Sequence, residues 1–171
     1  MGTIRVNGST SGYVELAAPA VAGSVVMTLP ATTGTLAVQG EAYGRSATAT
    51  VATSQSTTSN SYADLATVGP AVTVTTGTKA FVALCSNTDG QTNKAVSISV
   101  AVSGATTVAA SGPNGFGFTT STAGNELRGG VSFIITGLTA GSNTFTMKYL
   151  VSAGNTGTFT NRQISVIDMG S

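Results

Sequence analysis

The sequence lacks the residues that most enzyme and metal sites require. Its 171 residues include no histidine, no tryptophan and a single cysteine, Cys85. Without histidine, the commonest general base, neither a Ser-His-Asp nor a Cys-His arrangement can form within this chain. A zinc site needs several Cys, His or carboxylate ligands close together, and few are present. We therefore predict that the protein is not an enzyme and has no catalytic residues, metal or cofactor.

Charged side chains are equally scarce. Seven Lys or Arg and six Asp or Glu form 8% of the chain, against roughly 25% in an average globular protein. The net charge of +1 provides no basic footprint for nucleic acid or for an anionic membrane. A mean hydropathy of +0.28 is also too high for charge-driven disorder. We expect no nucleic-acid or membrane partner, and a surface covered by Thr, Ser, Gly, Asn and Ala.

Neither a disulfide framework nor a targeting segment is evident. The single Cys85 lies in the apolar run Phe81–Cys85, so we interpret it as a buried thiol that packs as a small hydrophobe. Residues 1–6 lack the apolar region of a signal peptide. The most apolar stretch, residues 16–27, contains Pro19 and Gly23 and is too short to cross a bilayer. We expect a soluble protein made without a secretion route of its own.

Apolar residues alternate with small polar ones through most of the chain. This period of two places Val96, Ile98, Val100 and Val102 on one face of a strand. A second such strand has its inward positions at Phe145, Met147, Tyr149 and Val151. Further strands are predicted at 71–75, 79–85, 106–110, 116–120, 131–136 and 163–168. We therefore predict an all-β fold, with an antiparallel β-sandwich or jelly-roll-like domain over residues 45–171.

Turn signals separate these strands. They occur at Gly69-Pro70, Thr76-Gly77, Asp89-Gly90, Gly112-Pro113, Gly129-Gly130, Ala140-Gly141 and 155–157. We interpret Asp89-Gly90 as a hairpin turn and residues 112–117 as a flexible loop rather than a phosphate-binding motif. The polar run Ser54–Ser61 has no periodicity, and is either an exposed connection or a strand edge without core contact.

The N-terminal residues 1–44 differ from the rest. Their short apolar clusters are interrupted by Pro19, Gly23, Pro30 and Gly34, and such a segment cannot close a core alone. We interpret it as an extended arm that attaches to the C-terminal domain, to another copy or to another protein. The residues expected to make its oligomer or partner contacts are Ile4, Val6, Tyr13, Val14, Leu16, Val25, Val26, Leu29 and Leu36.

Two stretches resemble structural proteins of tailed bacteriophages. Residues Gly8–Ser24, running into Leu29–Ala37, resemble a "G-x-V-x-L…P…AG…LP…GTLA" segment found near the start of phage tail-fibre and head-attached proteins. Residues 135–149 and 157–166 are similar to the last strands of a β-sandwich domain common in virion and prophage proteins. With residues 69–74 included, the resemblance covers most of the chain. The Leu-Pro-x-x-x-Gly-Thr-Leu element is the more specific part, because the turn at 137–145 also occurs in fibronectin-like sandwiches.

The resemblance implies a component of the virion, made in the host cytoplasm and assembled as a trimer. No repetitive shaft separates the arm from the sandwich, which favours a capsid decoration or cement protein over a fibre. Its partners would be further copies of itself and the major capsid protein or another virion protein. The alternative is a short tail or head fibre that binds the host receptor.

A third interpretation is a carbohydrate-binding module or a depolymerase. Such a protein needs aromatic side chains on its surface, and only Tyr43, Tyr62, Phe116 and Phe118 lie in suitable loops. We expect at least half of these four side chains to pack in the core instead.

Overall fold

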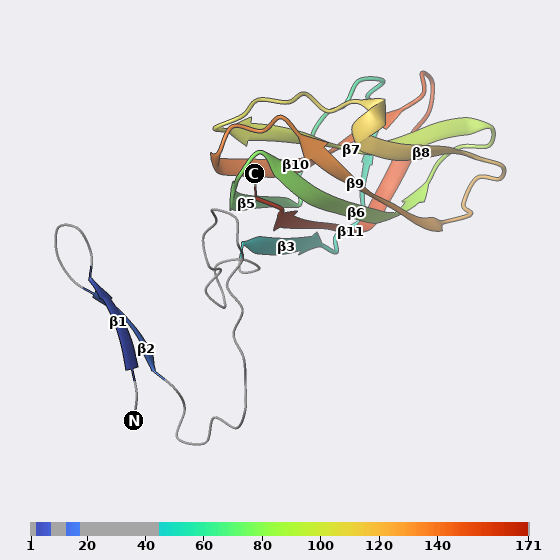
Figure 1. The fold of residues 1–171 in the computed structure, drawn as a ribbon. Helices are drawn as coiled ribbons and strands as arrows, with labels where there is room; N and C mark the ends of the chain where they lie inside the picture. Colours follow the sequence, from blue (N-terminus) through green and yellow to red (C-terminus); the bar gives the residue numbers. More distant parts are fainter. Residues whose placement is uncertain (1–2, 8–12, 18–44, 171) are drawn as a thin grey trace. The chain divides into compact units, whose positions relative to one another are not determined.

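The computed structural model describes residues 3–7, 13–17 and 45–170. The chain divides into two units, Met1–Leu36 and Ala37–Ser171. In the first unit, β1 (Thr3–Asn7) and β2 (Tyr13–Ala17) form an antiparallel pair (Figure 1). These two strands were not among those predicted from the sequence.

The second unit is all-β, as predicted. Its described residues contain no α-helix and a single short 3-10 helix, η1 (Gly112–Asn114). Its strands are β3 (Ser46–Val51), β4 (Gln55–Thr57), β5 (Ala71–Thr76), β6 (Lys79–Asp89), β7 (Lys94–Gly104), β8 (Gly115–Thr120), β9 (Leu127–Thr136), β10 (Gly141–Val151) and β11 (Gly157–Asp168).

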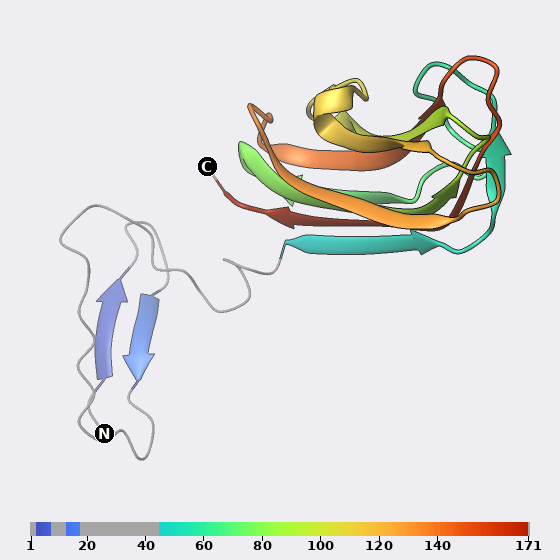
Figure 2. The same ribbon diagram turned by 90° about the vertical axis from the view of Figure 1, so that its right-hand side faces the viewer.

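These strands form two antiparallel sheets that pack face to face (Figure 2). One sheet, here called the β10 sheet, has the order β5-β10-β7-β8. The other, the β11 sheet, has the order β3-β11-β6-β9, and β4 also pairs with β11. Apart from the β3–β4 and β7–β8 links, each connection between successive strands crosses from one sheet to the other. Without β4, the eight strands of the two sheets have the order of a jelly roll.

The predicted inward residues form the core between the sheets. Val96, Ile98, Val100 and Val102 are at most 2% exposed, and Phe145, Met147, Tyr149 and Val151 are fully buried. The opposite sheet contributes Val82, Leu84, Ile164 and Val166 at the same depth. Burying one Val, Leu, Ile, Phe or Met side chain contributes about 1.5–3 kcal/mol. The burial of these alternating side chains therefore stabilises the packing of one sheet on the other.

One predicted hairpin and one predicted turn are wrong. Asp89-Gly90 does not close a hairpin, because β6 and β7 belong to opposite sheets and the turn carries the chain between them. Gly129 and Gly130 lie inside β9. A Cβ atom on Gly130 would come within 2.7 Å of the Leu84 carbonyl oxygen, so close approach of two strands explains this glycine.

Other predictions also need correction. Residues 106–110 form no strand, and only Val108 makes a β-bridge, to Val102. Residues 112–114 form η1 instead of a flexible loop. The prediction missed β3 because its sequence, SATATV, alternates only Ala with Ser or Thr before Val51 and lacks large apolar residues.

Cys85 is half-buried rather than part of the core. The inward positions of β6 are even-numbered, as the buried Val82, Leu84 and Ser86 show. Cys85 therefore lies on the outer face, where Arg128 donates a hydrogen bond to its Sγ atom at 3.3 Å. An apolar run of five residues does not reveal which of its members face the core.

Hydroxyl groups take the place of ions on the outer faces. Three directly opposed pairs of Thr or Ser are joined by hydrogen bonds of 2.8–3.0 Å: Thr48 with Ser165, Ser56 with Thr158, and Thr73 with Thr144. Such cross-strand pairs stabilise a sheet without charge.

We predict that Gly115→Ala destabilises the domain by about 1–3 kcal/mol, the usual cost of overpacking. A Cβ atom there would overlap the Ile98 carbonyl oxygen, so β8 would have to move away from β7. Gly112→Ala is the matched control, because a Cβ atom at Gly112 meets nothing within 4 Å. Urea unfolding of both variants tests this, and equal midpoints would contradict it.

Candidate functional site

The predicted contact residues in the first unit fall on β1 and β2. The register pairs Ile4 with Leu16 and Val6 with Val14, and Tyr13 lies opposite Asn7. The structure therefore brings five of the nine predicted contact residues onto one two-stranded sheet. The other four, Val25, Val26, Leu29 and Leu36, lie outside the described residues.

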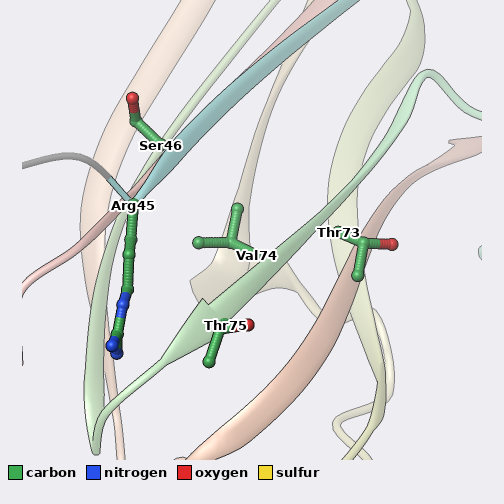
Figure 3. A pocket seen from close by; sticks show the side chains of 5 residues that line it. All are labelled: Arg45, Ser46, Thr73, Val74 and Thr75. Atoms are coloured by element: carbon green, nitrogen blue, oxygen red, sulfur yellow. The ribbon is translucent and has the colours of Figure 1, made fainter. Parts of the chain in front are cut away.

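Described residues line several small pockets. One of them, of about 260 Å³, lies between the edge strands of the two sheets. Figure 3 shows Arg45 and Ser46 at the start of β3 on one side, and Thr73, Val74 and Thr75 of β5 on the other. Pockets for small organic ligands usually have volumes of about 300–1,000 Å³. This pocket is therefore smaller than that class.

The described residues also contain no group of three or more His, Cys, Asp or Glu side chains that could hold a metal ion. Within the same residues, no helix is long and apolar enough to span a membrane. Two ion pairs occur in this part of the chain, Lys148 with Asp64 at 2.7 Å and Arg45 with Asp168 at 3.9 Å. Each pair joins one cation to one carboxylate.

The largest fully buried side chain belongs to a cation, Arg162. It faces inward because β11 has a bulge between Thr160 and Gln163, where Asn161 adopts a φ of 49°. The extra residue of a bulge shifts the alternation by one position. Phe159 and Ile164, five positions apart, can therefore both face the core, with Arg162 between them.

Arg162 is held by neutral acceptors. Its guanidinium donates to the carbonyl oxygens of Gly69 (3.2 Å) and Thr53 (3.3 Å) and to Oε1 of Gln55 (2.9 Å). It also lies 5.4 Å from the ring centre of Tyr149, as in a cation–π contact. Burying a charge is costly unless it is hydrogen-bonded. We therefore interpret this cluster as a structural element that ties β11 to β4 and to the 58–70 connection.

The hydroxyl of Tyr149 completes this cluster. It donates to the Gly69 carbonyl oxygen at 2.8 Å. Burial raises the pKa of Tyr149 to about 12, although the positive charge of Arg162 opposes part of the rise. Tyr62 also has a raised pKa, because of its partial burial, and a hydrogen bond with Ser97 counteracts this.

The Arg162 cluster was not predicted from the sequence. The run Ser54–Ser61 was expected to lack core contact, yet Gln55 binds the buried guanidinium from β4. The odd separation of Phe159 and Ile164 was the available signal for a bulge. The hydrogen-bond partners of Arg162 lie more than 90 positions away along the chain, and the sequence pattern did not reveal them.

Two of the aromatic residues considered for carbohydrate binding pack against the core. The Phe116 and Phe118 side chains are half-buried and stacked, with ring centres 6.3 Å apart. Tyr62 is half-buried, and Tyr43 lies outside the described residues. This agrees with the expectation that at least half of the four serve in packing.

The outer face of the β11 sheet has an exposed apolar row. The register places Ile134 of β9 opposite Phe81 of β6, and Phe81 opposite Ile167 of β11. Ile134 is 52% and Ile167 42% exposed, and Met169, just beyond β11, is 50% exposed. Phe81 is half-buried. Contiguous exposed apolar side chains mark surfaces that bind other proteins, so this row is the candidate interaction site of the domain.

Comparison with known proteins adds no relative. No protein-family model matches the chain, and no curated protein is significantly similar to it in sequence.

We predict that Arg162→Ala lowers the free energy of unfolding by about 3 kcal/mol, since it leaves a cavity and removes the hydrogen bonds. Arg162→Met fills more of the space without burying a charge, so its cost should be less than half as large. Urea unfolding measures both, and equal destabilisation would contradict the packing explanation.

From the raised pKa of Tyr149, we predict that the folded domain loses stability at high pH. Unfolded tyrosine ionises near pH 10, whereas folded Tyr149 stays neutral until about pH 12. The stabilisation that results from the raised pKa of Tyr149 is complete below pH 10. It decreases between pH 10 and 12, by up to about 3 kcal/mol. Urea unfolding across this range should show a steeper decline for the wild type than for Tyr149→Phe. Equal slopes would contradict the raised pKa.

Proposed function

We propose that this chain is a structural protein of a tailed-bacteriophage particle, a trimeric capsid decoration or cement protein that binds the major capsid protein. The observation that carries the proposal is the resemblance of residues 8–37 to the segment that begins phage tail-fibre and head-attached proteins. In this proposal the N-terminal segment is the anchor and the jelly roll is the exposed knob.

The fold is compatible with this role. Jelly rolls occur in viral capsid proteins and also in lectins, so the fold alone does not identify the function. On the outer surface of the domain, pairs of hydroxyl groups stand where ions are usual, and a row of apolar side chains is exposed. The cores of protein interfaces are depleted of Lys, Glu and Asp. A domain with this surface is suited to close packing among protein neighbours.

The attachment would depend mainly on apolar burial and on backbone pairing with a neighbouring sheet edge. Ile4, Val6, Val14 and Leu16 already lie on paired strands, β1 and β2. Each Å² of apolar surface removed from water contributes roughly 25 cal/mol, and a trimer multiplies the effect through avidity. Because few ion pairs are available, attachment should depend little on salt.

We predict that purified particles contain hundreds of copies of the chain, in proportion to the major capsid protein. Quantitative gel analysis against the major capsid band measures this number. A few tens of copies at most would contradict the decoration role and support the short fibre.

We also predict that deletion of residues 1–44 abolishes binding to undecorated particles, while residues 45–171 keep the circular dichroism spectrum of a β protein. Cosedimentation with particles, at low and at moderate salt, tests this. Binding by the truncated protein would contradict the arm as the anchor. Release of the full chain by moderate salt would contradict apolar attachment.

A further inference from the structure

The two ends of β9 have complementary surfaces. At one end is the apolar patch, defined as Phe81, Ile134, Ile167 and Met169, with Lys79 beside it. Lys79 is exposed and lies two positions before Phe81, on the same face of β6. The Met169 backbone donates a hydrogen bond to the Lys79 carbonyl oxygen at 3.1 Å. The patch therefore has a cation at its margin.

At the other end of β9 is the acidic tip, defined as Phe118, Asn125, Glu126 and Leu127. These residues line a pocket of about 120 Å³ between β8 and the start of β9. Leu127 is 50% exposed and Glu126 is exposed. The tip thus combines an apolar recess with a carboxylate, and the cation next to it, Arg128, is hydrogen-bonded to Asn87 and Cys85. This recess complements an apolar patch with a cation.

A single domain cannot join these two surfaces. Leu127 and Ile134 are seven positions apart on one strand, or roughly 23 Å at about 3.3 Å per residue. Neither Lys79 nor Glu126 has an ion-pair partner among the described residues. The complementary arrangement is therefore a head-to-tail contact between copies.

We propose that the apolar patch of one copy binds the acidic tip of a second copy, with Lys79 paired to Glu126 and an apolar side chain of the patch in the tip pocket. A head-to-tail contact of this kind forms a closed ring when its rotation closes. The inference deepens the oligomeric part of the proposed function, since it names the surfaces by which the domains associate.

Charge reversal in the full-length chain tests the pairing. Lys79→Glu and Glu126→Lys should each weaken self-association at least tenfold, because each places like charges together. The double variant should restore association to within about threefold of the wild type. Light scattering and analytical ultracentrifugation provide the dissociation constants. Lys148→Glu is the control, since Lys148 lies on β10 and pairs with Asp64 at 2.7 Å, and neither residue belongs to the patch or the tip.

The apolar part of the proposed contact between copies is tested by a second, matched pair of variants. Ile134→Ser should weaken association at least tenfold, whereas Val68→Ser should leave it unchanged. Val68 is the more exposed of the two, at 61% against 52%, but it belongs to neither surface. Unchanged circular dichroism spectra would show that both variants fold.

A wild-type chain that is monomeric at 100 µM would overturn the inference. So would an oligomer that resists both single charge reversals, or a double variant that fails to reassociate. Failure here is distinguishable from failure of the proposed function. If particles contain hundreds of copies of the chain but the variants leave its oligomer unaffected, decoration is supported and this contact is refuted. If the double variant restores association but the chain is absent from particles, this contact is supported and decoration is refuted.

Discussion

The apolar contact between the inner faces of the two sheets is the interaction on which the structure depends. In β7 and β10, large apolar side chains occupy every second position and are almost fully buried. The chain crosses between the sheets at most of its connections, so strands distant in sequence become neighbours and the sandwich is held by long-range contacts. The apolar row on the β11 sheet exists only because β6, β9 and β11 are held in one register.

The domain pairs most of its buried polar groups with very few ions, and among the described side chains the Arg162 Nε atom lacks a partner. Hydroxyl pairs span the outer faces, and the buried Asn143 donates to Thr76 Oγ1 while its Oδ1 atom accepts from the Thr106 backbone. Even the buried cation Arg162 is held by carbonyl and amide oxygens and an aromatic ring. Neutral hydrogen bonds are less sensitive to salt than exposed ion pairs. A surface with few ions suits the proposed association with protein neighbours better than electrostatic attraction from a distance.

The two proposals concern different parts of the chain. Attachment to a particle is assigned to the N-terminal segment, on the basis of resemblance and of its apolar clusters. Association between copies is assigned to the jelly roll, on the basis of exposed residues at the two ends of β9. Anchoring and oligomerisation would thereby be separate functions, each with its own contacts.

The sequence by itself determined the all-β class and the inward residues of β7 and β10, because alternation along one strand is a local property. It also indicated which residues of the N-terminal segment are apolar, although the pairing of β1 with β2 was not foreseen. Only the tertiary structure decided the jelly-roll order, the outward position of Cys85, the bulge at Asn161 and the burial of Arg162. Each of these depends on contacts between residues far apart in the chain. The apolar patch depends in the same way on the register of three strands, which no local pattern contains.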